Sequence, residues 1–240
     1  VSTKTIKENK KIVVATESEF APFEFKSLVN GKDTLVGADI ELAKAIGKKL
    51  GVKVEFSVMS FDNVLASVQS GKADIAIAGI SVTDERKKVY DFSDSYYTSE
   101  NVVIVKKDKV NDFTSADSLA KQTVGTQKGS VQETIAKKQL SKASVVSLAS
   151  NGEMINELKS GQIQAVVLEK AIAEGYIAQN DDLTLASFNL KSDGSDAYAV
   201  AIRKGSDDLL KEINAVIKET KESGKFDQWL KEASSYKQSK

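Results

Sequence analysis

The side chains best suited to chemistry in this chain follow the ends of its predicted strands. In an open α/β sheet ligands bind beyond the carboxyl ends of the strands, so the residues just past each strand are candidates for a site. These residues are mostly carboxylates, hydroxyls, amides and glycines: Glu17, Phe20, Ala78, Gly79, Ile80, Ser81, Gln127, Gly129, Ser130 and Glu169. Groups of this kind suit a small polar ligand, which they would hold by charge pairing and hydrogen bonds.

The composition excludes most kinds of catalytic site. The chain has 240 residues with no His and no Cys, which removes thiol nucleophiles, the commonest general base, Ser-His-Asp triads and almost all zinc chemistry. We therefore expect no enzyme activity, no metal and no cofactor. Lys and Arg together number 34, as do Asp and Glu, so no net charge attracts the chain to nucleic acid.

The sequence repeats itself at a spacing of 90 residues. Residues 48–79 align without a gap with residues 138–169, and both segments contain a Ser-Gly pair at the same place. Two copies are too few for a solenoid, so the repeat predicts two similar lobes with a ligand-binding cleft between them. Because Gly79 and Glu169 occupy equivalent positions, we expect them to face each other across that cleft.

Short apolar strands alternate with helical patterns in both halves, which predicts an α/β fold with right-handed crossovers. In the first half Asp39 is predicted to cap a helix that ends at Gly51. The predicted strands are 12–15, 52–59, 73–77, 123–126, 145–148 and 165–168, and the predicted helices are 39–50, 62–70, 130–140, 154–160 and 207–232 with a break at Gly224.

Two further apolar strands, 101–105 and 197–202, flank the second half. We predict that they carry the chain into the second lobe and back, which would form a two-strand hinge. Lobe 1 is then predicted to contain residues 1–99 and 198–240, and lobe 2 residues 100–197.

The two ends of the chain are polar and rich in lysine. The first eleven residues are predicted to form a tether and the last few a frayed tail. No apolar run approaches the ~20 residues that a membrane-spanning helix needs.

Three motifs indicate a family. Residues 74–86 read DIAIAGISVTDER and are followed by Asp91-Phe92-Ser93, while Ala21-Pro22-Phe23-Glu24 precedes them and Gly224-Lys225-Phe226 lies near the end. From residue 11 to residue 232 the chain resembles the polar amino-acid-binding proteins of ABC importers, the bacterial extracellular solute-binding proteins of family 3. The resemblance implies the type II periplasmic-binding-protein fold, or Venus flytrap, whose two α/β lobes close on a ligand by hinge motion.

The resemblance also implies contacts for the backbone of an amino-acid ligand in the first lobe. Arg86 matches the arginine that grips the α-carboxylate, for which a guanidinium offers two parallel N–H bonds. Ser81 and the main-chain amides and carbonyls at Ala78 and Gly79 match the supporting donors and acceptors. Ala78-Gly79 departs from the hydroxyl pair of some relatives, so only main-chain groups can serve there.

In the second lobe the resemblance implies contacts near a helix N-terminus and a strand end. Ser130 and Gln132, close to Gln127, match donors at the start of a helix, where a carboxylate is favoured. A plain N-cap is the alternative role for Ser130, and the two roles can coexist. Glu169 matches an acidic residue, often Asp in relatives, that accepts the ligand's α-ammonium.

Glu17 is predicted to select the substrate. With a zwitterion neutralised by Arg86 and Glu169, the charge of Glu17 would be left for a cationic side chain, because a buried charge without a partner is costly. Phe20 and Phe61 match rings that sandwich the ligand side chain, and a planar guanidinium stacks well between rings. Arginine is therefore favoured over lysine.

Together these expectations describe an extracytoplasmic receptor that closes on arginine, or second on lysine or histidine, and presents it to an ABC transporter permease. The alternatives are a receptor for glutamine or another polar amino acid, a dehydratase-like enzyme on the same scaffold, and the sensing module of a larger receptor. We expect a monomer that binds no nucleic acid. A lipid anchor at the cell surface suits the lysine-rich start, and a free periplasmic protein is the alternative.

Overall fold

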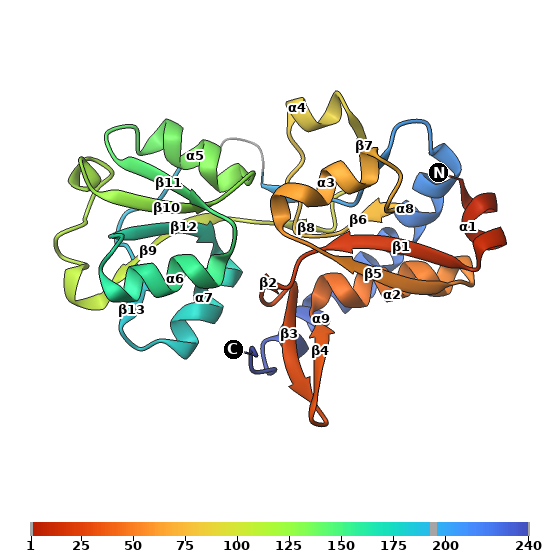
Figure 1. The fold of residues 1–240 in the computed structure, drawn as a ribbon, viewed down its shortest axis with the longest axis horizontal. Helices are drawn as coiled ribbons and strands as arrows, with labels where there is room; N and C mark the ends of the chain where they lie inside the picture. Colours follow the sequence, from red (N-terminus) through yellow and green to blue (C-terminus); the bar gives the residue numbers. More distant parts are fainter. Residues whose placement is uncertain (1, 193–195, 240) are drawn as a thin grey trace. The chain divides into compact units, whose positions relative to one another are not determined.

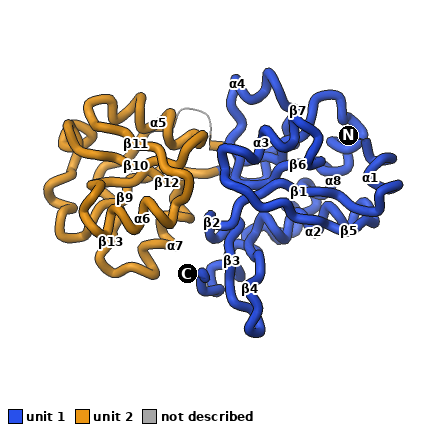
Figure 2. Tube along the Cα trace, viewed as in Figure 1, with its two compact units in different colours: residues 1–98, 197–240 blue, residues 99–196 orange. Residues whose placement is uncertain are grey.

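The computed structural model describes residues 2–192 and 196–239, which fall into two compact units. Lobe 1 contains residues 1–98 and 197–240, and lobe 2 contains residues 99–196 (Figure 2). The predicted boundaries lie one residue further along the chain at each crossing.

Lobe 1 is built on a five-stranded sheet with the order β5-β1-β6-β15-β7. Strand β1 pairs in parallel with β5 and β6, whereas β15 is antiparallel to both β6 and β7. The strands are β1 (Lys11–Thr16), β5 (Lys53–Val58), β6 (Ile75–Ala76), β7 (Tyr90–Phe92) and β15 (Ala201–Arg203). The apolar runs of the central strands β1, β6 and β15 are buried, as expected for strands covered on both faces.

Helices cover both faces of this sheet. Helix α3 (Phe61–Gln69) packs on one face and α2 (Ala38–Leu50) on the other (Figure 1). Helix α2 also contacts α8 (Asp207–Glu222) and α9 (Lys225–Ala233). The two C-terminal helices are separated at Gly224, where φ is +69°, so the predicted break is observed.

The predicted cap of helix α2 is wrong. Gly37 occupies the N-cap position, and Asp39 is the second residue inside the helix. The side chain of Asp39 is fully buried, and its Oδ2 accepts the backbone N–H of Gly79 at 2.9 Å. A short-range capping pattern could not reveal a hydrogen bond to a residue forty positions away.

A small three-stranded sheet projects from lobe 1 (Figure 1). It contains β2 (Glu19–Phe20), β3 (Glu24–Val29) and β4 (Lys32–Val36). Asn30 and Gly31 join β3 to β4 with φ values of +52° and +78°, the turn chemistry that tight hairpins favour. The hairpin thereby places Glu24 at the start of β3, next to the body of the lobe.

Neither end of the chain behaves as predicted. Residues 3–9 form helix α1 (Thr3–Asn9), whose Ile6 is buried, so this segment is not an extended tether. At the other end Ser239 donates its N–H to the carbonyl of Lys26 at 2.8 Å, and Ser27 donates its hydroxyl to the carbonyl of Lys237 at 2.7 Å. The part of β3 that the short strand β2 leaves unpaired provides these partners, which composition alone does not indicate.

Lobe 2 has a sheet of the same design, with the order β11-β10-β12-β9-β13. Strand β10 is parallel to β11 and β12, and β9 is antiparallel to β12 and β13. The strands are β9 (Asn101–Lys106), β10 (Thr123–Gln127), β11 (Ser144–Leu148), β12 (Ala165–Glu169) and β13 (Leu183–Leu185). The sequence repeat therefore corresponds to equivalent parts of the two lobes: β5, α3 and β6 in one, and β11, α6 and β12 in the other.

The described residues of lobe 2 also form the α-helices α5 (Val131–Gln139), α6 (Asn151–Ser160) and α7 (Lys170–Gln179). Helices α5 and α6 lie on opposite faces of the sheet (Figure 1). Helix α7 was not predicted, although its buried residues Ile172, Ala173 and Tyr176 follow helical spacing.

The two predicted hinge strands adjoin the points where the chain passes from one lobe to the other. Residues 101–106 form β9 inside the lobe 2 sheet, and residues 201–203 form β15 inside the lobe 1 sheet. Each predicted strand therefore runs on from a crossing into the sheet of a lobe, where most of its apolar residues are buried. The two crossing segments meet just beside these strands, where β8 (Tyr97–Thr98) pairs with β14 (Ala197–Tyr198).

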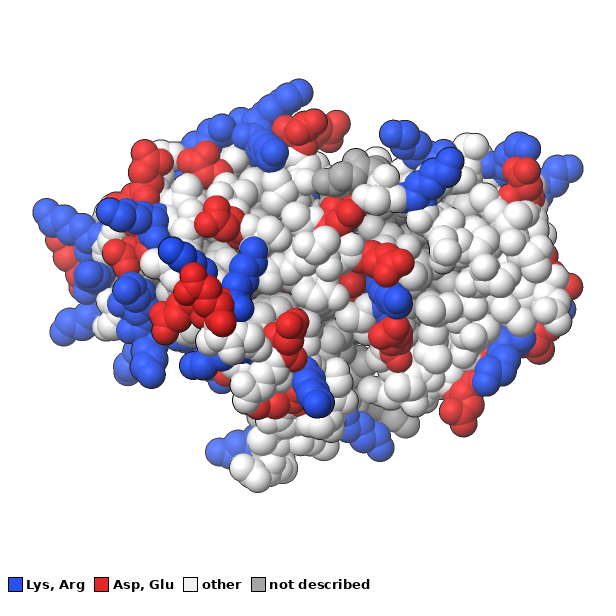
Figure 3. Space-filling view, turned by 180° about the vertical axis from the view of Figure 1, so that it is seen from behind, with Lys and Arg blue, Asp and Glu red and all other residues white. Residues whose placement is uncertain are grey.

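The surface of the described residues carries both signs of charge. Basic and acidic side chains are interspersed on the face shown in Figure 3. Among the described helices, none combines the length and the apolar character that crossing a membrane requires.

Candidate functional site

The segment after β6 carries the main-chain groups predicted to contact a ligand. Gly79 has φ of +57°, and a Cβ placed there would lie 2.3 Å from the ring of Phe20. Only glycine fits this combination of backbone conformation and close contact. The N–H of Gly79 donates to Asp39, so it is not one of the ligand donors that we expected.

Arg86 and Ser81 lie together further along the same segment. Helix α4 (Asp84–Lys87) is capped by Thr83, whose hydroxyl accepts the N–H of Arg86 at 3.1 Å. The Arg86 Nη1 then donates to the carbonyl of Ser81 at 2.7 Å. The hydroxyl of Ser81 is buried and has no hydrogen-bond partner among the described residues, which suits a group that meets a ligand.

Phe20 and Phe61, the two rings predicted to sandwich the ligand side chain, lie in lobe 1 and are buried. Phe20 packs on Gly79, and the Arg86 guanidinium carbon lies 5.8 Å from the centroid of the Phe61 ring. This distance is in the range of a cation–π interaction. Phe61 therefore supports the predicted carboxylate-binding arginine, in addition to the side-chain stacking that the sequence suggests.

Burial shapes the electrostatics around Arg86 and Glu17. Burial lowers the pKa of Arg86, and the neighbouring Tyr90 and Glu85 raise it in part. Glu17, directly after β1, is only 4% exposed. Its negative charge acts on Glu24, whose pKa is raised mainly by burial, then by Asp39, and also by Glu17. Lobe 1 therefore holds a buried acidic region beside the Gly79 segment.

In lobe 2 the predicted residues surround the start of helix α5. The hydroxyl of Ser130 accepts the N–H of Glu133 at 3.3 Å and donates to the carbonyl of Gln127 at 2.7 Å. Ser130 is thus an N-cap, the alternative role considered from the sequence. The side-chain amide of Gln132, the second residue of helix α5, donates to the side chain of Asn101 at 2.7 Å.

Glu169 has a structural role that the sequence did not suggest. Its carboxylate caps helix α7, with Oε2 accepting the N–H groups of Ala171 at 2.8 Å and Ile172 at 3.3 Å. The side chain is almost completely buried. Backbone donors at a helix N-terminus favour an ionised carboxylate, which is the form that an α-ammonium would need.

The structure groups the predicted residues within each lobe. In lobe 1 it brings Phe20 to Gly79 and Arg86 to Ser81 and Phe61; in lobe 2 it brings Ser130 to Gln127. Sequence reasoning missed the roles of Asp39, which bonds to the Gly79 segment from the core of lobe 1, and of Glu24, which is buried near Asp39. Glu24 stands in the motif at residues 21–24 and Asp39 was predicted only as a helix cap, and nothing local in the sequence indicates that either is buried.

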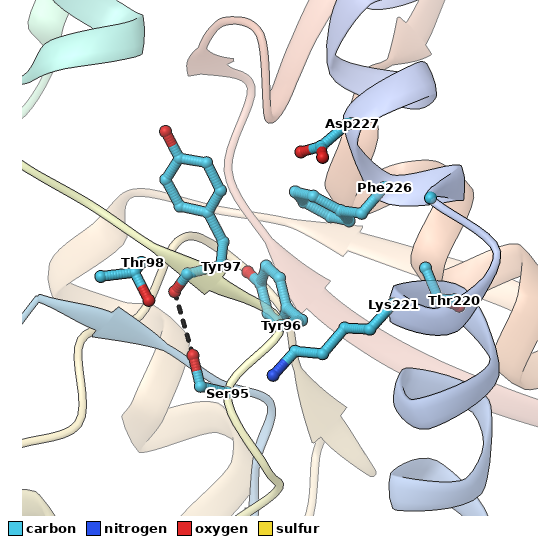
Figure 4. Close-up of a pocket in the computed structure, with 9 residues that line it drawn as sticks. Ser95, Tyr96, Tyr97, Thr98, Thr220, Lys221, Phe226 and Asp227 are labelled. Atoms are coloured by element: carbon cyan, nitrogen blue, oxygen red, sulfur yellow. Dashed lines mark hydrogen bonds between the residues drawn. The ribbon is translucent and has the colours of Figure 1, made fainter.

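A cavity of about 290 Å³ lies elsewhere in lobe 1 and contains none of the predicted ligand contacts. It is lined by residues of the β8 region and of helices α8 and α9, including Tyr96, Tyr97, Lys221, Phe226 and Asp227 (Figure 4). The Ser95 hydroxyl donates to the carbonyl of Tyr97 at 3.1 Å along its edge. Among the described residues, no group of His, Cys, Asp and Glu side chains could hold a metal ion.

A family model for "Bacterial extracellular solute-binding proteins, family 3" matches residues 12–233. The chain belongs to this family. Its two α/β lobes are those of a type II periplasmic binding protein, so the fold class expected from the sequence is confirmed.

Similar proteins include binders of more than one amino acid. The structure of the amino acid ABC transporter substrate-binding protein AbpA from Streptococcus pneumoniae Canada MDR_19A bound to L-arginine is 51% identical, with a TM-score of 0.93 over 96% of this chain and 97% of that one. The arginine-binding extracellular protein ArtP of Bacillus subtilis (strain 168) is 34% identical over 92% of this chain and 85% of its own length. The glutamine-binding protein GlnH of the same strain is 32% identical over 95% and 84%.

Proposed function

We propose that this protein binds L-arginine outside the cytoplasm and delivers it to the permease of an ABC importer. The observation that carries the proposal is the arrangement of Arg86, which is held by the Ser81 carbonyl and stacked against Phe61 beside a buried Ser81 hydroxyl. A fixed guanidinium with a nearby hydroxyl is suited to an α-carboxylate. The likeness to arginine-bound AbpA supports arginine as the amino acid.

Lobe 2 would contribute the partner of the α-ammonium. The carboxylate of Glu169 is held by two backbone N–H groups of helix α7, and Ser130 and Gln132 lie at the start of α5. We infer that ligand contacts from both lobes stabilise a closed state relative to an open one. Glu17 would then set the preference for a cationic side chain, with arginine before lysine and histidine.

Calorimetric titration with arginine, lysine, histidine and glutamine tests the proposal. We expect arginine to bind most tightly and small-angle scattering to report compaction when it binds. Recovery of unchanged arginine after long incubation would agree with a binding protein, whereas turnover would favour a dehydratase-like enzyme. Absence of arginine binding would contradict the proposal.

Glutamine is the second candidate ligand, because GlnH is nearly as similar to this chain as ArtP is. Tighter binding of glutamine than of arginine would decide in its favour. We further propose a monomer, attached to the cell surface by a lipid at its N-terminal side. Sedimentation measures the first, and metabolic labelling of the full-length protein with a fatty acid measures the second.

A further inference from the structure

Two fully buried carboxyl groups are neighbours in lobe 1: the N–H of Asp39 donates to the carbonyl of Phe23, the residue directly before Glu24, at 2.9 Å, and each acid acts on the pKa of the other. Glu24 comes from strand β3 and Asp39 from the first turn of helix α2, and each is 0% exposed. Tyr96, which also lines the cavity of Figure 4, is 3% exposed and lies next to Asp39. Neither acid belongs to the set of residues proposed to touch the ligand.

The hydrogen-bond donors around these two acids are distributed unequally. Asp39 Oδ2 accepts the N–H of Gly79 at 2.9 Å, and its position in the first turn of α2 places it at the positive end of the helix dipole. Asp39 also has the Tyr96 hydroxyl as a neighbour, which helps to lower its pKa. Among the described residues, neither oxygen of Glu24 has a hydrogen-bond partner, and no Lys or Arg forms an ion pair with either acid. Only Asp39 is therefore surrounded by groups that stabilise a negative charge.

Two ionised carboxylates cannot be accommodated here. Removing a charge from water is costly unless it is paired, and like charges at close range add to that cost. One proton on the pair removes the repulsion and supplies the donor that the remaining oxygens lack. In agreement, burial raises the pKa of Glu24 well above its ordinary value, with further contributions from Asp39 and Glu17. Burial also raises the pKa of Asp39, which contacts with Glu24, Tyr96 and Gly79 lower in part.

The hydrogen bond from the Gly79 N–H to Asp39 fixes the orientation of the whole 78–79 peptide. In a trans peptide the N–H and the preceding C=O point in opposite directions, so the carbonyl of Ala78 is directed away from Asp39. The bond also holds Gly79 against the ring of Phe20, and Ser81 follows two residues later. A shift of this peptide would therefore move several of the ligand contacts that we propose.

We propose that Glu24 is protonated and donates to Oδ1 of Asp39, and that ionised Asp39 is thereby a positioning residue for the 78–79 peptide of the arginine site. This inference rests on the proposed function for its effect on binding, but not for the protonation of Glu24. The pair acts only through the Gly79 segment and touches no ligand atom.

Infrared spectroscopy tests the protonation directly. Near neutral pH ordinary carboxyl groups are ionised, so the carbonyl stretch of a protonated carboxylic acid should stand out in the wild-type protein. The substitution Glu24→Gln should abolish this band. Absence of the band from the wild-type protein, or its survival in Glu24→Gln, would overturn the proposal whether or not arginine binds.

Calorimetry tests the positioning role. Asp39→Ala should weaken arginine binding by about tenfold or more, the factor expected for a lost hydrogen bond to a charged group. Asp74→Ala is the matched control. Asp74 also accepts a backbone N–H, that of Val13 at 2.8 Å, but it lies before strand β6, whereas Gly79 follows that strand. This control should change the affinity by less than about threefold, well below the change expected for the loss of one hydrogen bond to a charged group.

A conservative variant distinguishes positioning from a general loss of structure. Asp39→Asn keeps an oxygen that can accept the Gly79 N–H, and should recover most of the affinity lost in Asp39→Ala. Equal affinity in Asp39→Ala and the wild-type protein would refute the positioning role, as would equal losses in the Asp39 and Asp74 variants. If the wild-type protein binds glutamine and not arginine, the proposed function fails and the same comparison is made with glutamine.

Discussion

Replacing Arg86 by alanine should cause the largest single loss of arginine affinity. The guanidinium of the part-buried Arg86 donates to the Ser81 carbonyl at 2.7 Å and lies 5.8 Å from the centre of the Phe61 ring. Without Arg86 the ligand carboxylate would enter this region with no cation to meet it. Removing one member of a desolvated charge pair costs ~2–5 kcal/mol, which corresponds to a weakening of roughly 30-fold to several thousand-fold.

Arg86→Lys separates charge from geometry. Lysine keeps the positive charge but loses the paired N–H groups and the flat surface that stacks on Phe61. We therefore expect an affinity between those of the wild-type and alanine variants. If lysine restores wild-type affinity, the bidentate contact is not what Arg86 provides.

Titration calorimetry with arginine, accompanied by melting curves of the ligand-free proteins, is the assay. Lys87→Ala is the matched control, because it removes the same charge from an exposed position on the same helix α4. It should leave the affinity unchanged within error. Unchanged arginine affinity in Arg86→Ala, in a protein that is still folded, would refute the proposed carboxylate contact.

Three other substitutions test the surroundings of this contact. Glu17→Gln should weaken arginine and lysine binding and spare glutamine; equal effects on all three ligands would remove Glu17 as the selecting residue. Gly79→Ala should destabilise the protein and weaken binding, because its Cβ would lie 2.3 Å from the Phe20 ring. Gly51→Ala is its control: Gly51 also has a positive φ but has open space around it, so this substitution should cost only the ~1–2 kcal/mol of backbone strain. Glu24→Gln tests the pH dependence of stability. Burial raises the pKa of Glu24 from its ordinary 4.5, so the folded state keeps a proton that the unfolded state releases. The stability that this group contributes therefore declines as the pH rises above 4.5. Glutamine resembles the protonated acid, so the free energy of unfolding of Glu24→Gln, measured in urea, should rise relative to that of the wild-type protein between about pH 4 and neutral pH. A difference in this free energy that does not change with pH would contradict a protonated Glu24.

The two-lobe architecture could be predicted because part of the sequence is repeated once, in the second half of the chain. The 90-residue repeat places equivalent strands and helices in both lobes, and the apolar runs of the central strands are long enough to be recognised. Motif positions after these strands also located Gly79, Ser81 and Arg86 on one segment. Local patterns and family likeness were sufficient where the contacts are made within a few residues.

Contacts between distant segments could not be predicted. Asp39 looks like a helix cap, and only the folded lobe shows that its partner is Gly79. Glu169 caps a helix that was not recognised, because glutamate is not among the preferred N-cap residues. The packing of α1 and of the C-terminal residues depends in the same way on partners supplied by other elements, such as Asp208, which accepts the N–H of Thr3 at 3.0 Å.

The state of Glu24 bears on how lobe 1 can favour a cationic ligand without losing stability. Glu17, Glu24 and Asp39 are all buried in the same lobe, and the charge of Glu17 already acts on Glu24. Three ionised carboxylates would repel one another in every ligand-free molecule. With Glu24 protonated and Asp39 compensated by the Gly79 N–H and the helix N-terminus, the repulsion on Glu17 is reduced. Reduced repulsion at Glu17 is the condition that its proposed selection of arginine requires.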